Sequence, residues 1–307
     1  MGRRADGGLE QRPGPEWIAR PERSNTLAMR FMAWVARTLG RSPARLLLYP
    51  ICLYFLAFSG EARAASQKYL GKALGRAPTF ADSFRHYLTF SATILDRVFL
   101  LDNQAWRFDV QVHGADIIEE TLADGRGCFL IGAHLGSFEI IRAVGRTHGL
   151  SVTMVMYEEN ARKLGSVLAA VNPRLQMEII PLGRVDSILN VETALARGEV
   201  VGMLGDRAIG GDGALSCAFL GEPAAFPTGP LRIAAMLRRP VALMVGLYRG
   251  GNRYEVHFER LADMSLTDRG ERDRAVEAVL RHYVGRLEHY CRIEPYNWFN
   301  FYDYWKR

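Results

Sequence analysis

The stretch "CFLIGAHLGSFEII", Cys128 to Ile141, decides the fold. Its first six residues are apolar or small, which is typical of a buried strand, and the run ends at His134. Gly136 allows a tight turn, and Ser137 is a good N-cap for a helix over the apolar residues that follow. A buried strand that passes through a short turn into a helix is the repeating unit of an α/β sheet.

The same alternation continues along the chain. Short apolar runs occupy 108–114, 127–133, 151–157, 177–183, 199–206, 240–249 and 253–261. Helix-length segments lie between or after them, at 115–123, 137–147, 160–171, 186–196, 229–237 and 268–292. Strands that alternate with helices predict an α/β fold, with a mostly parallel or mixed sheet flanked by helices.

The region before these runs has a different pattern. Residues 1–15 are rich in Gly, Pro and Arg, and we expect them to be disordered. Apolar residues at helical spacing then predict a helical amino-terminal, membrane-proximal region over 16–107, followed by the α/β core over 108–307. No linker separates the two, so a single domain is expected overall.

Charge is concentrated at the amino end. Residues 1–45 contain nine arginines and four acidic residues, a net charge of 9 − 4 = +5 out of +6 for the whole chain. The apolar segment Leu46–Ser59 follows directly, but only fifteen uncharged residues separate Arg45 from Glu61, whereas a helix that spans a bilayer needs about 20. The segment is either a buried core helix or an anchor that lies on a membrane, and the arginines favour the anchor. The aromatic and basic interleaving typical of nucleic-acid grooves is absent, so we expect no nucleic-acid partner.

Metal and disulfide chemistry have little support in the sequence. The four cysteines are far apart and form no CxxC pair, and no HExxH motif is present. We therefore expect no metal and no disulfide framework.

His134 and Glu139 are the first candidates for chemistry. His134 follows the strand, and Glu139 falls in the first turn of the next helix, so the two side chains are expected to approach each other. A carboxylate bound to one imidazole nitrogen fixes the tautomer and leaves the other nitrogen as a general base. The pair could also be a satisfied detail of the core.

Ser137 offers a rival chemistry. As a nucleophile it would make the protein a thioesterase or lipase-like hydrolase, but the G-x-S-x-G pattern is missing, because Glu139 stands at the final glycine position. A non-catalytic lipid-binding protein on the same fold is a third reading.

Two further segments are expected near the same edge of the sheet. Asp206 and Arg207 follow the strand predicted at 200–204, and the carboxyl ends of parallel strands share one edge. An arginine there can bind a phosphate or stabilise an oxyanion, although a surface Asp–Arg pair is also common. Gly229 begins a helix that carries Arg232, and the amides at a helix start suit an anion.

Taken together and in this order, these segments resemble the bacterial lipid A biosynthesis acyltransferase family, within the lysophospholipid acyltransferase superfamily. The resemblance rests on the H-x4-E motif His134–Glu139, "GDR" at 205–207, "FLGEPAAFPTGPLRIAA" at 219–235 and "EPYNWFNFYDYW" at 294–305. It covers roughly 20–305. The segments at 16–41 and 294–305 look closer to a subgroup associated with aryl-polyene-type lipid pathways.

The resemblance implies a function and a location. An acyl chain would pass from a thioester, on acyl carrier protein or coenzyme A, to a hydroxyl of a glycolipid or phospholipid. The enzyme would act at the cytoplasmic face of the bacterial inner membrane, attached peripherally or by its amino end, with the thioester as co-substrate and no cofactor.

The resemblance also assigns roles to residues. His134 would be the general base and Glu139 its partner. Arg207, with Asp206, would bind the acceptor phosphate or stabilise the oxyanion. The remaining residues assigned to the substrate site are Gly229, Arg232, Ser137 and Phe138.

Overall fold

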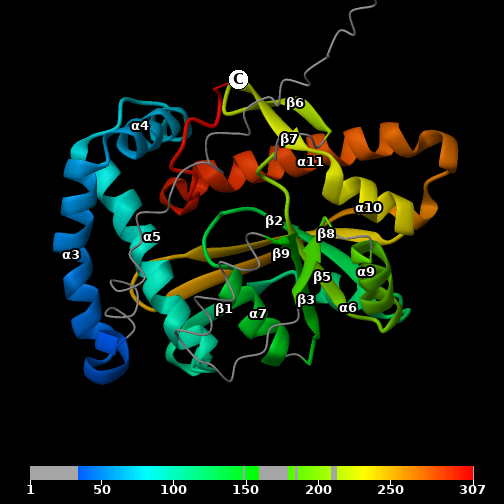
Figure 1. Ribbon diagram of the computed structural model, residues 1–307, viewed down its shortest axis with the longest axis horizontal. Coiled ribbons are helices and arrows are strands. Elements are labelled where there is room, and N and C mark those ends of the chain that lie inside the picture. Colours follow the sequence, from blue (N-terminus) through cyan, green and yellow to red (C-terminus); the bar gives the residue numbers. More distant parts are fainter. Residues whose placement is uncertain (1–33, 148, 159–178, 184–185, 209–212, 307) are drawn as a thin grey trace, which may run out of the picture.

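A seven-stranded sheet forms the centre of the protein in a computed structural model that describes residues 34–147, 149–158, 179–183, 186–208 and 213–306 (Figure 1). The strand order is β1-β9-β8-β2-β5-β3-β4. Neighbouring strands are parallel except β8 and β9, so the sheet is mixed, and the predicted α/β class is confirmed. The strands are β1 (Asp109–His113), β2 (Cys128–Gly132), β3 (Val152–Tyr157), β4 (Ile179–Leu182), β5 (Val200–Leu204), β8 (Pro240–Tyr248) and β9 (Arg253–Asp263).

Helices precede, separate and follow these strands. They are α3 (Arg41–Phe58), α4 (Gly60–Leu74), α5 (Phe80–Leu101), α6 (Ala115–Leu122), α7 (Phe138–Thr147), α9 (Ser187–Ala196), α10 (Gly229–Leu237) and α11 (Arg272–Ile293). The helix predicted at 160–171 and the disorder predicted at 1–15 lie outside the described residues. A hairpin that the sequence did not predict, β6 (Ala214–Phe219) with β7 (Glu222–Pro227), forms a separate two-stranded sheet.

The sheet is covered on both faces. Phe129 and Ile131 of β2 belong to the core that includes α11, whereas Cys128 and Leu130 belong to the core that includes α5, α6 and α7. In Figure 1 these helices lie on opposite sides of the sheet. Because β2 is buried on both faces, all five of its residues are buried, and this explains its unbroken apolar sequence.

The amino-terminal helices pack beside the sheet. α3 lies against α5 and is joined to it by Arg41, which binds Asp96 through two bonds of 2.7 and 2.8 Å. Within the described residues, no single helix is long and apolar enough to cross a membrane. α3 and α4 reach that length and composition only as a pair, and they are bent by 98° where they meet.

A carboxyl-terminal segment holds the turn that follows β2. Phe299 donates its N–H to the carbonyl of His134 at 2.7 Å, and Gly136 donates to the carbonyl of Asn297 at 2.8 Å. Gly136 has a φ of +70°, and a Cβ at this position would overlap the carbonyl oxygen of Gly246, so only glycine fits. The tight turn predicted here is therefore confirmed.

One buried histidine holds this segment against α5. The ring nitrogens of His86 contact the carbonyl oxygen of Trp298 and the hydroxyl of Ser66, both at 2.8 Å. Burial lowers the pKa of His86 to about 4, so the ring is neutral at physiological pH. His86 is thus a structural contact between α5 and the segment that holds the site.

Candidate active site

His134 and Asp206 meet where β2 and β5 end. The two strands pair in parallel, Gly132 opposite Leu204, and this pairing places the residues that follow them side by side. His134 Nδ1 lies 2.8 Å from Asp206 Oδ1, and the backbone N–H of His134 donates to Asp206 Oδ2 at 3.1 Å. The expectation that the two segments share one edge of the sheet is confirmed.

Glu139 does not occupy the place predicted for it. Its carboxylate forms an ion pair with Arg97 of α5 at 2.6 Å and accepts a hydrogen bond from the Ser137 hydroxyl at 3.1 Å. The predicted contact between His134 and Glu139 is therefore wrong, and Asp206 binds the imidazole instead. The reason is that Glu139 lies in the first turn of α7, which packs against α5, whereas Asp206 comes from the strand next to β2.

Asp206 is fully buried and fully bonded. Its Oδ2 accepts hydrogen bonds from Trp298 Nε1 at 3.1 Å and from Asn300 Nδ2 at 2.9 Å, in addition to the His134 amide. Burial alone would raise the pKa of this carboxyl, but His134, the Arg207 guanidinium and the Asn300 amide outweigh it and hold the pKa well below its usual range. Asp206 therefore stays ionised and can only accept hydrogen bonds.

The state of the His134 ring follows from that of Asp206. Because the carboxylate is an acceptor, Nδ1 carries the hydrogen and Nε2 holds the lone pair. Among the described residues, none forms a hydrogen bond with Nε2, and the side chain is 29 % exposed. Burial and the Arg207 cation lower the pKa of His134 below its usual value, although Asp206 acts in the opposite direction. The ring is therefore neutral at neutral pH, with a lone pair that can accept a proton.

Arg207 is held beside the pair by the carboxyl-terminal segment. Its Nε donates to Asn300 Oδ1 at 2.7 Å and its Nη2 to the carbonyl of Phe299 at 3.2 Å. The guanidinium also lies 5.8 Å from the centre of the Tyr302 ring. Asn300 thus binds Asp206 with its amide nitrogen and Arg207 with its amide oxygen.

Ser137 and Phe138 lie at the start of α7. The Ser137 hydroxyl accepts a hydrogen bond from the backbone N–H of Ile140 at 3.3 Å, so the predicted N-cap role is confirmed. Ser137 is only 2 % exposed. The Phe138 ring packs over Gly202 of β5, where a Cβ would lie 3.3 Å from the ring.

Gly229 begins α10, as predicted, with Pro230 in the first turn. Since α10 leads directly into β8, which runs parallel to β2, its first residues lie toward the edge of the sheet that carries His134. Arg232 is exposed and lies 3.7 Å from Asp273 of α11. The described contacts do not join Arg232 to His134.

A cavity of about 320 Å³ lies between α5 and α7 and reaches Glu139. Apolar side chains of α5 and α7 and two arginines of α7 line it: Leu100, Leu101, Ala143, Arg142 and Arg146. The space therefore combines apolar walls with positive charge next to the H-x4-E motif.

The residues that complete the site were missed in the sequence. Trp298, Asn300 and Tyr304 all bind Asp206, the last through a bond of 2.5 Å from its hydroxyl to the Asp206 carbonyl. The run "EPYNWFNFYDYW" at 294–305 contributed to the family resemblance, but none of its residues was assigned to the site. The sequence did contain one sign of their role. An otherwise aromatic run includes two asparagines, Asn297 and Asn300, and a buried side-chain amide requires specific hydrogen-bond partners.

No donor set for a metal surrounds His134 in the described part of the chain. The four cysteines are buried and unpaired, at Cys52, Cys128, Cys217 and Cys291. The one group of described histidines and acids close enough to share an ion lies on β1 and β9, which β8 separates from β2.

The sequence matches a family described as bacterial lipid A biosynthesis acyltransferase over residues 26–307. None of the curated proteins compared with the chain matches it. The family match includes the β2–α7 motif, the Asp206–Arg207 pair and the carboxyl-terminal segment that binds them. The chain therefore belongs to the bacterial lipid A biosynthesis acyltransferase family, whose members transfer acyl groups to lipid acceptors.

Proposed function

We propose that this protein is a membrane-associated O-acyltransferase that moves an acyl chain from a thioester to a hydroxyl of a glycolipid or phospholipid. The observation that carries the proposal is the His134–Asp206 pair, with Nδ1 bound and Nε2 without a described partner, in a chain of the lipid A acyltransferase family. The donor would be acyl carrier protein or coenzyme A, and the site of action the cytoplasmic face of the inner membrane.

His134 acts as the general base in this proposal. Nε2 takes the proton of the acceptor hydroxyl while its oxygen attacks the thioester carbonyl carbon. The C–S bond then breaks, the thiolate takes the proton back from the imidazolium, and an ester is released. Asp206 keeps the proton on Nδ1 and stabilises the imidazolium that forms.

In this proposal, Arg207 and the start of α10 stabilise the negative charges of the acceptor phosphate and of the oxyanion. Arg207 bears its positive charge next to the imidazole, which suits an acceptor phosphate or the oxyanion of the tetrahedral intermediate. The positive end of the α10 dipole, at Gly229, suits an anion on the same edge of the sheet, with Arg232 one turn further along.

Glu139 is a positioning residue in this proposal. It pairs with Arg97, whose charge also lowers the pKa of His134, and it accepts the hydrogen bond of the capping serine. Glu139 therefore balances a cation near the base and holds the start of α7, without touching the imidazole.

Mass spectrometry of membrane lipids tests the proposed function. A strain that lacks the protein is expected to lose a lipid species heavier by one acyl chain, and wild type is expected to restore it, whereas His134→Ala is not. Equal protein amounts on an immunoblot are the control. If the lipids are unchanged, or if His134→Ala restores the missing species, the proposal is wrong.

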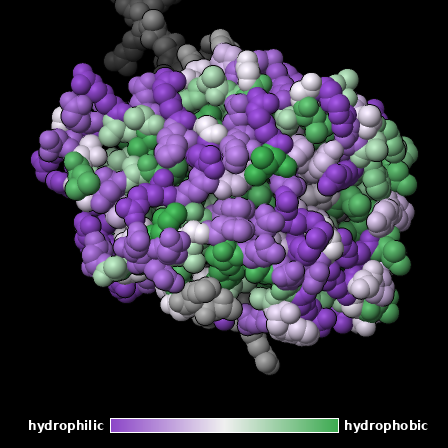
Figure 2. All heavy atoms as spheres, turned by 180° about the vertical axis from the view of Figure 1, so that it is seen from behind, coloured by the Kyte–Doolittle hydropathy of each residue, from purple (hydrophilic) through white to green (hydrophobic). Residues whose placement is uncertain are grey.

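The outer face of α3 supports membrane attachment. Its buried residues face α5, and large apolar side chains on the rest of the helix are exposed: Leu46, Leu47, Tyr49, Leu53, Tyr54, Phe55 and Phe58. Phe58 is 68 % exposed and Leu46 is 70 % exposed. Figure 2 shows hydrophobic residues along the right-hand edge, where α3 lies in that view. Because nine arginines lie within residues 1–45, the occupant favoured by charge is an anionic lipid surface.

Substitution of this face is expected to weaken membrane binding. Leu53→Glu and Phe58→Glu should each lower the affinity for anionic phospholipid vesicles roughly tenfold or more, since each removes a large apolar contact. Vesicle flotation at fixed salt measures the bound fraction. Leu266→Glu is the matched control, because Leu266 is 82 % exposed but lies outside α3, and it should bind like wild type. Equal binding by all four proteins would contradict attachment through α3.

A further inference from the structure

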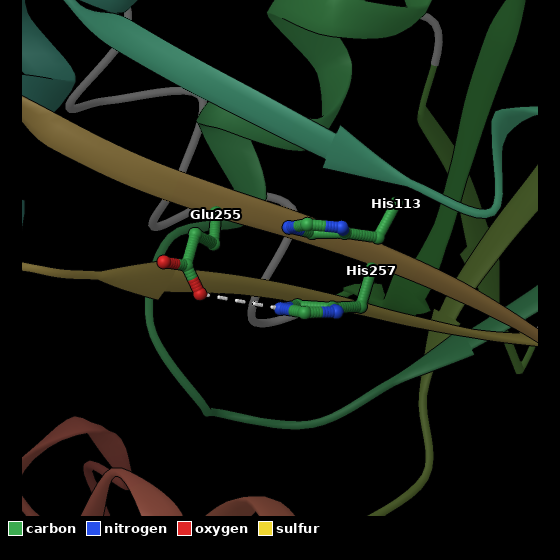
Figure 3. Close-up of side chains that lie close together, drawn as sticks. All are labelled: His113, Glu255 and His257. Atoms are coloured by element: carbon green, nitrogen blue, oxygen red, sulfur yellow. Dashed lines mark ion pairs between the residues drawn. The ribbon is translucent and has the colours of Figure 1, made fainter.

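His113 and His257 lie side by side on adjacent strands. β1 and β9 pair in parallel with His113 opposite His257, so both side chains project from the same face of the sheet. Glu255 precedes His257 by two residues on β9 and shares that face. Figure 3 shows the two rings one above the other, with both pointing toward the Glu255 carboxylate.

The distances among these side chains suit a shared ion. The two rings are stacked, with centroids 4.6 Å apart and planes at 16°. His257 Nε2 lies 3.6 Å from Glu255 Oε2, and one ligand atom from each of the three residues fits within 4.8 Å. Two ligand atoms of a tetrahedral zinc ion with bonds of 2.0–2.1 Å are about 3.4 Å apart. The distance between His257 Nε2 and Glu255 Oε2 is therefore close to the distance between two zinc ligands. His113 is exposed on an edge strand, and its ring can move to close the longest separation.

A buried nitrogen in the group lacks an ordinary hydrogen bond. His257 Nε2 is shielded from solvent, and no partner among the described residues is within hydrogen-bond distance. At 3.6 Å, the Glu255 oxygen is too far away to satisfy it. Such a nitrogen, aimed at a carboxylate and lying under a second imidazole, is a second observation that points to an ion.

The neighbouring residues orient Glu255 and leave an oxygen for the ion. Arg249 binds Glu255 Oε1 at 3.1 Å, so Oε2 is the oxygen that faces His257. Glu259, the next residue on this face, is bound by Arg286 and Tyr290, and the Tyr290 ring packs 5.2 Å from that of His257. These contacts fix the group in the way that outer partners fix metal ligands.

We propose that His113, Glu255 and His257 bind a divalent transition-metal ion, with zinc the best match. Two imidazoles and one carboxylate are ligands that zinc accepts, and three protein ligands leave one position for water. The ion would tie edge strand β1 to β9. The site is separate from His134, since β8 lies between β9 and β2.

Metal titration of the purified full chain, prepared without a histidine tag and freed of metal by chelator, tests the proposal. Isothermal titration with ZnCl₂ is expected to show one ion per chain, and CoCl₂ should produce the visible absorption bands of tetrahedral cobalt. His113→Ala, Glu255→Gln and His257→Ala should each weaken zinc binding at least tenfold. His282→Ala is the matched control, because His282 is exposed on α11 and outside the group, and it should bind like wild type.

Two results would overturn the site: a wild-type chain that binds no zinc at micromolar concentrations, or variants at all three positions that bind as tightly as wild type. Circular dichroism checks that each variant is folded. If His257→Ala unfolds, the exposed His113 and the partly exposed Glu255 still decide the question. Because the readout is metal binding, a negative result leaves the proposed acyl transfer untouched.

Discussion

His134→Ala is expected to lower kcat for acyl transfer by on the order of 10²–10⁴-fold, the usual contribution of a general base. The alanine leaves the acceptor hydroxyl without a base, since Asp206 is buried behind the imidazole and already accepts its hydrogen bonds elsewhere. Release of free thiol from an acyl thioester, in the presence of lipid acceptor, measures the rate. KM should change much less than kcat, because the imidazole acts on the reacting hydroxyl.

Ser137→Ala separates the acyltransferase from a serine hydrolase. The Ser137 hydroxyl caps α7, so its loss should cost about 1 kcal/mol of stability but keep the rate within about tenfold of wild type. A serine nucleophile would instead lose as much rate as His134→Ala. If His134→Ala keeps the wild-type rate while folded, the role proposed for the imidazole is wrong.

The pH dependence of kcat/KM is expected to reveal the charges around His134. The base must be neutral, and burial together with Arg207 lowers its pKa, so the acid limb should lie below the ordinary histidine value of about 6.5. Arg207→Gln removes a cation that lowers this pKa, and the acid limb should move to higher pH. Asp206→Asn removes the anion that raises it, so the limb should move to lower pH.

Asp206→Asn should also reduce the rate itself. An amide in place of the carboxylate no longer stabilises the imidazolium and no longer fixes the hydrogen on Nδ1, so a loss on the order of 10²–10⁴-fold is expected. Arg274→Gln is the matched control, since Arg274 is exposed and pairs with Glu271 far from the site in sequence. If the acid limb of the pH profile stays in place in both Arg207→Gln and Asp206→Asn, the assignment of that limb to His134 is wrong.

Local pattern predicted the fold well. The apolar run before His134 predicted β2, Gly136 the turn and Ser137 the cap, because each depends only on residues a few positions apart. Strand alternation predicted the sheet for the same reason. The β6–β7 hairpin was not predicted, because exposed residues interrupt the buried ones in both strands, unlike the continuously buried β2.

Contacts between distant residues escaped prediction. Glu139 was expected to bind His134 because it is close in sequence, whereas the actual partner, Asp206, is 72 residues away and depends on β5 lying next to β2. Trp298 and Asn300 are more than ninety residues beyond Asp206. His113 and His257, which no motif connects, meet only through the pairing of β1 with β9.

The way α3 is fixed to the sheet bears on how the enzyme would meet its lipid. Besides the Arg41–Asp96 pair, Arg45 binds the Tyr248 hydroxyl and the Gly251 carbonyl, both at 2.5 Å, at the end of β8. A helix held this rigidly transmits its own tilt to the whole molecule. If α3 rests on the bilayer, the entropy cost of fixing the orientation of the protein is paid when the protein binds the membrane. The edge of the sheet that carries His134 then keeps a constant angle to the lipid surface. The search for an acceptor then becomes two-dimensional, among lipids that already face the enzyme in a single orientation.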